Sequence, residues 1–181
     1  EISACLVGSE MCIRDRYSVS PDDRLQLRLH GKGFFFDNAR RKHGTLMHEV
    51  LSRIRTPKDI PASVESYRLA GVINREEAAE LISRLEELLQ AEEVKAWYDG
   101  SARVLNEVDI LFGKGLSKRP DRVIIKGGKV IVVDYKFGER QDKRHPNQVR
   151  NYLQLIRKMG FERVDGYLWY VELGKIEAVN K

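Results

Sequence analysis

Cysteine is scarce in this sequence: Cys5 and Cys12 are the only two among 181 residues, and both lie within the first twelve. Zinc sites built from four cysteines, iron–sulfur clusters and disulfide frameworks need more thiols within the folded part of a chain. We therefore exclude these three classes for the body of the protein. A low cysteine content also suits a reducing compartment, so we expect a cytoplasmic location.

Long hydrophobic runs are missing as well. A membrane helix needs about 20 consecutive apolar residues, and no stretch approaches that length, so we expect no association with a membrane. The sequence also lacks the Gly-x-x-x-x-Gly-Lys-Ser/Thr motif that cradles nucleotide phosphates. No helicase motor is therefore encoded in these residues.

The residues that are present describe a globular protein. Charged residues make up 33% and hydrophobic residues 42% of the chain, which is typical of a folded domain. The formal net charge of +5 is compatible with a polyanionic partner such as nucleic acid, although charge alone does not establish one. We expect a single domain over residues 17–181 and a non-native or disordered leader over residues 1–16, which show no periodic apolar pattern.

Helical patterns dominate the first half of this domain. We interpret residues 17–29 as a short strand and residues 30–44, "HGKGFFFDNARRKHG", as a loop. The stretch "GTLMHEVLSRI" then places apolar residues at helical spacing, with His48 at the edge of the apolar face. The clearest helix is "NREEAAELISRLEELLQ", in which Asn74 and Glu77 form a capping box. "EVKAWYDG" adds a short helix.

Strand patterns dominate the second half. Four segments rich in valine, isoleucine and aromatic residues are bounded by glycine-containing turns, and we expect each to be a strand: "RVLNEVDILFG", "DRVIIK", "KVIVVDYK" and "VDGYLWYVEL". Between the last two, "PNQVRNYLQLIRKMG" has a helical stripe and a terminal glycine. This order predicts an α/β fold with a mixed central β-sheet flanked by helices.

A hairpin between the second and third strands brings two acids together. If Gly127 and Gly128 form its two-residue turn, the register places Asp121 directly opposite Asp134. Side chains opposed in this way have Cβ atoms about 5 Å apart, and like charges there are destabilising. Such a pair normally needs a neighbouring cation.

Two sources of positive charge remain open at this point. Lys136 shares the face of Asp134, so a structural Asp-Lys-Asp cluster is one interpretation. The other is a Mg²⁺ ion bridging the acids, with the lysine free to act on a substrate. Glu107 is a possible additional acid on the preceding strand, where Asp109 has the same parity, so that one of these two would face solvent.

Two further polar positions are ambiguous on pattern alone. His48 is at a position where a packed, hydrogen-bonded histidine is the usual finding. Gln148 and Tyr152 stand four residues apart and project from one side of a helix, which suits a half-buried tyrosine with a polar neighbour.

Five motifs in order resemble the PD-(D/E)XK nuclease superfamily, and more closely the RecB/AddA-type nuclease domain found at the carboxyl end of UvrD/Rep-like helicases. "GTLMHEVL" resembles the histidine-bearing helix of that family, and "NEVDIL" its acidic strand. "RPDRVI" resembles the segment with the metal-binding aspartate, "VDYKFG" the acid-x-lysine strand, and "NQVRNYL" the Gln-x-x-x-Tyr helix. The resemblance covers residues 44 to 181 and implies a restriction-endonuclease-like core.

The resemblance also implies roles for particular residues. His48, Asp121 and Asp134 would bind metal, and Lys136 would be the catalytic lysine, with Asp121 and Asp134 counted in the catalytic set. Glu107 would be a further acid, and Gln148 and Tyr152 would position the lysine or the DNA. The cofactor would be Mg²⁺, with Mn²⁺ also accepted because a histidine is a softer ligand than Mg²⁺ prefers.

The implied function is metal-dependent hydrolysis of DNA, exonucleolytic rather than endonucleolytic. The partner would be a UvrD/Rep-type helicase module, in cis or in trans, acting in DNA repair or recombination. Two alternatives have other chemistry: a catalytically inactive nuclease-fold module that binds DNA or serves as a scaffold, and a basic structural domain whose Asp-Lys cluster is only an ion-pair network.

Overall fold

The computed structural model describes residues 32–112, 116–138 and 141–179, with side chains described from residue 43 onward. The expected leader and the expected strand in residues 17–29 lie outside the described residues. The chain divides into two units, 1–37 and 38–181, and the second contains all the elements below except the start of the first helix. Among the described helices, none combines the length and apolarity that crossing a membrane requires.

Helix α3 spans Lys32–Arg53 and is longer than its sequence pattern predicts. The prediction of a loop over residues 30–44 is wrong from residue 32 onward. The predicted helical pattern begins at Gly44, but the helix runs through this residue. A Cβ atom at this position would lie 3.5 Å from the Cβ of Phe137, an ordinary van der Waals distance, so the packing there leaves room for a side chain.

Three α-helices and one short 3₁₀ helix complete the helical half, at these bounds: η1 Pro57–Asp59, α4 Ile60–Leu69, α5 Arg75–Gln90 and α6 Glu92–Lys95. The predicted capping box of α5 is confirmed. The Asn74 side chain accepts a hydrogen bond from the backbone N–H of Glu77 at 2.9 Å, and the Glu77 carboxylate accepts one from the Asn74 N–H at 2.7 Å. The short helix expected in "EVKAWYDG" is present as α6, whereas η1 and α4 had no predicted counterpart.

A five-stranded sheet has the order β1-β4-β5-β6-β7. Its strands are β1 Arg103–Asn106, β4 Arg122–Lys126, β5 Lys129–Lys136, β6 Arg163–Tyr170 and β7 Lys175–Ala178. Strands β5 and β6 are parallel, and the other neighbours are antiparallel. The mixed sheet expected from the sequence is confirmed, with β7 as an additional edge strand.

The β4–β5 hairpin has the predicted register. Its pairs run from Lys126 opposite Lys129 back to Arg122 opposite Val133. Gly127 and Gly128 have φ values of 56° and 74°, the left-handed conformation that a type I′ turn requires at both central positions. Extension of this ladder by one residue brings Asp121 to Asp134.

The expectation of one continuous strand over "RVLNEVDILFG" is wrong. Strand β1 ends at Asn106, and Glu107 adopts a φ of 52°, which turns the chain out of the sheet. Strand β2, Ile110–Phe112, instead pairs with β3, Leu116–Lys118, as a separate two-stranded sheet. The Glu107 N–H remains tied to the Asp121 carbonyl at 3.0 Å, so the turn stays next to the start of β4.

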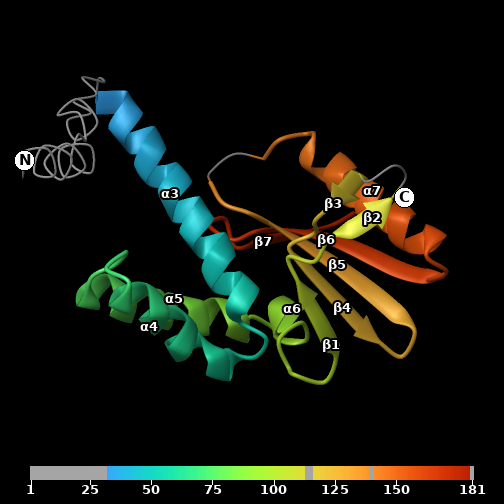
Figure 1. Cartoon of the computed structure of the whole chain (residues 1–181), viewed down its shortest axis with the longest axis horizontal. Coiled ribbons are helices and arrows are strands. Elements are labelled where there is room, and N and C mark those ends of the chain that lie inside the picture. Colours follow the sequence, from blue (N-terminus) through green and yellow to red (C-terminus); the bar gives the residue numbers. More distant parts are fainter. Residues whose placement is uncertain (1–31, 113–115, 139–140, 180–181) are drawn as a thin grey trace, which may run out of the picture. The chain divides into compact units, whose positions relative to one another are not determined.

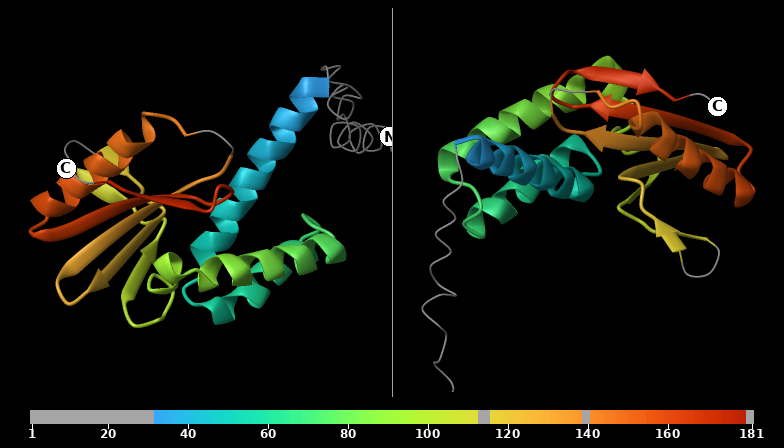
Figure 2. Two further views of the ribbon diagram at one scale, coloured as in Figure 1. Left: turned by 180° about the vertical axis from the view of Figure 1, so that it is seen from behind. Right: turned by 90° about the horizontal axis from the view of Figure 1, so that it is seen from above.

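Helices cover both faces of the five-stranded sheet (Figures 1 and 2). On one face, the carboxyl-terminal half of α3 and helices α4–α6 form a core with alternate strand residues such as Val133 and Tyr135. On the other, α7, His145–Lys158, packs on residues such as Val132. Asp134 and Lys136 alternate with Val133 and Tyr135, so they lie on the α7 face.

Close packing of α7 depends on Gly166 in β6. A Cβ atom there would lie 2.6 Å from Val149 Cγ1 and 3.0 Å from the Leu153 methyl carbons. This packing fixes α7 against the strands that carry the predicted acids and lysine.

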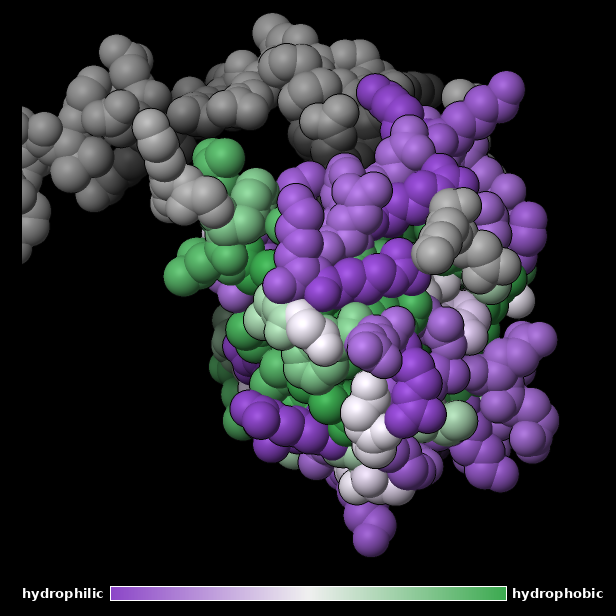
Figure 3. Space-filling model, turned by 90° about the vertical axis from the view of Figure 1, so that its right-hand side faces the viewer, coloured by the Kyte–Doolittle hydropathy of each residue, from purple (hydrophilic) through white to green (hydrophobic). Residues whose placement is uncertain are grey.

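The surface on the side shown in Figure 3 carries hydrophilic side chains over most of its area, with a smaller hydrophobic area between them.

Candidate active site

The predicted acids and lysine meet where β4 begins and β5 ends. Asp121 directly precedes β4, while Asp134 and Lys136 are among the last three residues of β5. Asp134 is 1% exposed, and Asp121 is partly buried. Antiparallel pairing of the two strands brings these ends together, as the hairpin register predicted.

The Asp121 carboxylate is held by one backbone donor. Its Oδ2 accepts a hydrogen bond from the Tyr135 N–H at 2.6 Å, and its Oδ1 lies 3.6 Å from His48 Nδ1 on α3. Burial, with a smaller effect of Lys136, lowers the pKa of His48 to about 4. The imidazole is therefore neutral near pH 7, and its approach to Asp121 is not an ion pair. A neutral imidazole retains the lone pair that a metal ligand needs.

Glu107 joins these two residues. His48, Glu107 and Asp121 each offer one ligand atom, and the three atoms lie within 4.8 Å of one another. Burial raises the pKa of Glu107 above its usual range, opposed by Arg119. The left-handed turn at Glu107 places it there, a feature that strand alternation does not predict.

Asp109 lies apart from this group. It is paired with Arg119, whose Nη2 is 3.0 Å from its Oδ2, and the Asp109 side chain is 39% exposed. Of the two acids in this segment, Glu107 and Asp109, the second is therefore the one that faces solvent.

Asp134 contacts Lys136 rather than the His48–Glu107–Asp121 group. The Lys136 Nζ lies 2.5 Å from Asp134 Oδ2, so the ammonium group is the charge partner of this buried carboxylate. Burial raises the pKa of Asp134, and Lys136 opposes that effect. Of the three residues predicted to bind metal, the structure therefore groups His48 and Asp121 with Glu107, whereas Asp134 contacts Lys136.

The predicted Gln148–Tyr152 pair on α7 contacts the lysine. Lys136 Nζ donates to Gln148 Oε1 at 3.2 Å, and Gln148 Nε2 donates to the Tyr152 hydroxyl at 2.8 Å. Tyr152 in turn donates to the Arg119 carbonyl at 3.1 Å. Burial raises the pKa of Tyr152 to about 12, so the phenol keeps the proton that this chain of hydrogen bonds requires.

The group of donors fits a divalent cation. Burial and the neighbouring Asp134 both raise the pKa of Asp121, which is the behaviour expected of like charges crowded in a poorly solvated place. A cation removes that penalty. Two carboxylates suit Mg²⁺, and an imidazole beside them suits Mn²⁺.

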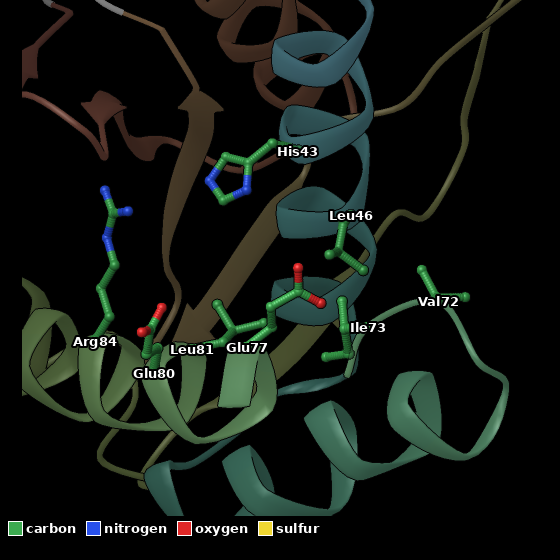
Figure 4. A pocket seen from close by; sticks show the side chains of 8 residues that line it. All are labelled: His43, Leu46, Val72, Ile73, Glu77, Glu80, Leu81 and Arg84. Carbon is green, nitrogen blue, oxygen red and sulfur yellow. The ribbon is translucent and has the colours of Figure 1, made fainter. Parts of the chain in front are cut away.

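A separate hollow of about 320 Å³ lies between α3 and α5 (Figure 4). Its lining consists of His43, Leu46, Val72, Ile73, Glu77, Glu80, Leu81 and Arg84. None of the predicted site residues is among them. Leu46 and His48 stand two positions apart on α3 and so point to nearly opposite sides of the helix.

Sequence patterns assigned no role to Arg122, the residue after Asp121. Its side chain is completely buried, and strand alternation places it with Ile124 on the face covered by α3–α6. A charged residue at an inward position of an apolar strand was the available signal.

A mixed sheet between helical layers, with two acids and a lysine at the ends of adjoining strands, is the arrangement of a restriction-endonuclease-like fold. The family model of the PD-(D/E)XK nuclease superfamily matches residues 22–181, and the chain belongs to this superfamily. A comparison with curated proteins gives no significant match.

Proposed function

We propose that this chain is a nuclease that hydrolyses phosphodiester bonds of DNA with the help of Mg²⁺ or Mn²⁺. One observation carries the proposal: Lys136 lies 2.5 Å from Asp134, beside a group in which His48, Glu107 and Asp121 can all reach one ion. A purely structural ion-pair cluster has no need of the neutral histidine and the additional, partly buried acid.

The metal would be held by His48, Glu107 and Asp121, with Asp134 as the further ligand that the family resemblance implies. Bound there, a divalent cation would neutralise charge on the scissile phosphate and acidify a water molecule. The protein supplies the rest. Tyr135 orients Asp121 through a backbone hydrogen bond, and burial keeps His48 neutral.

Lys136 is the proposed catalytic cation. Its side chain is 20% exposed, and its ammonium group contacts Asp134 and Gln148. A fixed positive charge in a poorly solvated site stabilises the extra negative charge of a phosphodiester transition state more strongly than it would in water. Gln148 and Tyr152 hold the lysine in place, and the exposed Lys143 would contact the DNA backbone.

The finer assignments are part of the same proposal. The order of motifs supports a RecB/AddA-type domain, and with it an exonuclease that works with a UvrD/Rep-type helicase module in DNA repair or recombination. The low cysteine content supports a cytoplasmic location. Cleavage of end-labelled DNA separates exonuclease from endonuclease action, since an exonuclease releases mononucleotides or short products from the ends.

The test is cleavage of end-labelled single- and double-stranded DNA by the parental protein and by Lys136→Ala, with Mg²⁺, Mn²⁺ or EDTA. We expect cleavage only with metal, and a loss of at least about 100-fold in rate for Lys136→Ala, because an electrostatic stabiliser of the transition state is removed. Lys95→Ala is the matched control: it removes a lysine whose side chain is 68% exposed and which has no role in the proposed site, and it should keep the parental rate. Circular dichroism checks that each variant is folded.

Two results would contradict the proposal. Parental cleavage rates in Lys136→Ala would remove the lysine from the mechanism. An absence of metal-dependent cleavage of either DNA, in a protein that still binds DNA, would favour the alternative of an inactive nuclease-fold module.

A further inference from the structure

Arg122 is a buried cation directly beside the candidate site. It is the first residue of β4, follows Asp121, and is 0% exposed. Arginine is almost never buried to this extent unless most of its donors are satisfied, and here Nη1 and Nη2 have partners while Nε has none. Among the described residues, no carboxylate forms an ion pair with its guanidinium, so its partners must be of another kind.

Four hydrogen bonds from the guanidinium join three separate parts of the chain. Nη1 donates to the carbonyl of Ile54 at 2.8 Å and to the side-chain oxygen of Asn106 at 3.3 Å. Nη2 donates to the carbonyls of Arg55 at 3.0 Å and Trp97 at 2.8 Å. Ile54 and Arg55 directly follow α3, so the guanidinium also lies near the partly negative carboxyl end of that helix, where a cation is favourable.

The ring of Tyr98 supports the same group from the side. Its centroid lies 3.7 Å from Arg122 Cζ, within the range of a cation–π interaction. The Tyr98 hydroxyl lies 2.8 Å from that of Tyr135, the residue whose N–H holds Asp121. The guanidinium is therefore tied to the candidate site by packing as well as by sequence.

Asn106 adds a second link between the same elements. Its Nδ2 donates to the Ser52 carbonyl at 2.6 Å near the end of α3, and Asn106 itself precedes Glu107. Arg122 and Asn106 together join the end of α3, the end of β1 and the start of β4. These three elements carry His48, Glu107 and Asp121, respectively.

We propose that Arg122 is the positioning residue of the candidate metal group, an inference that rests on the proposed function. The three donor side chains come from three elements, and they keep their spacing only while the ends of those elements are held together. None of the four hydrogen bonds of Arg122 goes to a proposed metal ligand. Arg122 therefore acts on the ligands indirectly, by holding together the segments that carry them. Residues of this kind set the affinity of a site for its metal.

A purely structural role makes a different prediction. If Arg122 only stabilised the fold, metal binding would change no more than in any equally destabilised variant. Lysine keeps the positive charge, but its three donors lie on a single nitrogen and do not reproduce the planar fork of the guanidinium. Methionine fills a similar volume without charge or donors, and leaves the carbonyls at the end of α3 without this partner.

The experiment compares Arg122→Lys and Arg122→Met with Leu85→Ala, in which a buried leucine of α5, a helix without candidate ligands, is shortened. Mn²⁺ affinity is measured by calorimetry at a temperature where circular dichroism shows every protein folded. We expect both Arg122 variants to bind Mn²⁺ about 10- to 100-fold more weakly and Leu85→Ala to keep the parental affinity. The Mn²⁺ concentration for half-maximal cleavage should rise in parallel, with the maximal rate restored by excess Mn²⁺.

The possible failures are distinct. Parental Mn²⁺ affinity in both Arg122 variants, or an equal loss in Leu85→Ala, would overturn the positioning role while leaving the proposed function intact. A reduced maximal rate that excess Mn²⁺ does not restore would also overturn it. Failure of the parental protein to bind Mn²⁺ would contradict both the proposed function and this inference.

Discussion

Asp121 and Asp134 are two carboxyl groups whose ionisation the fold makes difficult. Burial raises the pKa of each, and for Asp121 the neighbouring Asp134 adds to the effect. Lys136 offsets part of this cost. In the absence of metal, at least one of the two is therefore protonated in the folded protein at a pH where it is ionised in the unfolded chain.

This difference predicts that stability in EDTA falls as pH rises from 6.5 to 8. The folded state holds a proton that the unfolded state has already lost, so raising the pH favours unfolding. The slope is at most about 1.4 kcal/mol per pH unit for each proton. The lowered pKa of His48 acts in the opposite direction, but this effect fades as pH rises above 6.5, the ordinary pKa of a histidine. Urea denaturation across this pH range measures the slope.

Asp121→Asn is the informative variant because it keeps an acceptor for the Tyr135 N–H while removing the titrating group. Its slope should be smaller than that of the parental protein. Asp109→Asn, at an exposed acid, should keep the parental slope. A parental stability that is flat or rising between pH 6.5 and 8 would show that neither aspartate retains its proton.

At the scale of elements, two glycines lie at helix packing contacts that differ in how much space they leave for a side chain. An added Cβ at Gly166 would meet Val149 and Leu153 of α7 at 2.6 to 3.0 Å, whereas one at Gly44 would meet Phe137 at an ordinary 3.5 Å. The same chemical change should therefore have opposite effects at the two positions.

We expect Gly166→Ala to lower the free energy of unfolding by about 1–3 kcal/mol, the usual cost of overpacking. Gly44→Ala should raise it by about 0.5–1 kcal/mol, because alanine loses less conformational entropy in a helix. Urea denaturation measures both. Equal effects of the two substitutions would mean that α7 can move away from β6 at no cost. Gly166→Ala should also lower the rate of cleavage, because displacing Val149 would move the adjoining Gln148, which contacts Lys136.

Local patterns predicted some elements and missed others for physical reasons. The Gly127-Gly128 turn set the register of β4 and β5, and so the meeting of Asp121 with Asp134. The break at Glu107 was not predictable, because a left-handed conformation at a glutamate leaves no mark in the sequence. The start of α3 was missed because glycine is a poor helix former, which placed the predicted boundary at Gly44 although the helix continues through it.

The site was predicted in part for the same reasons. Side-chain alternation brought Asp134 and Lys136 to one face, and helical spacing brought Gln148 and Tyr152 to one side. Which residue each of these side chains contacts depends on tertiary packing, and the local sequence pattern does not contain that information. Lys136 contacts Gln148, and Glu107 rather than Asp134 completes the group of three donors.

At the scale of the whole molecule, a metal that binds only the folded state should stabilise it. At 100 times its dissociation constant, a ligand adds about 2.7 kcal/mol, which for a protein of this size corresponds to an increase in Tm of about 5–10 °C. We expect that increase with Mn²⁺ relative to EDTA, measured by differential scanning calorimetry.

Asp121→Asn should abolish the increase, because it removes one of the three donors. Asp165→Asn is the control, since that aspartate is exposed to 46% and is paired with Lys129. If Mn²⁺ leaves the parental Tm unchanged, the cluster is an ion-pair network without a metal, the structural alternative considered for these residues.

The two supports of the site differ in how they respond to point mutation. The donor that holds Asp121 Oδ2 is the main-chain N–H of Tyr135, a group that every residue except proline retains, and a tyrosine codon does not reach proline by one base change. The bonds that join α3, β1 and β4 depend instead on the side chain of Arg122, and no other residue type reproduces its fork of donors. A point mutation at Tyr135 therefore leaves the hydrogen bond to Asp121 available, whereas any substitution of Arg122 removes the bonds that set the spacing of the neighbouring segments.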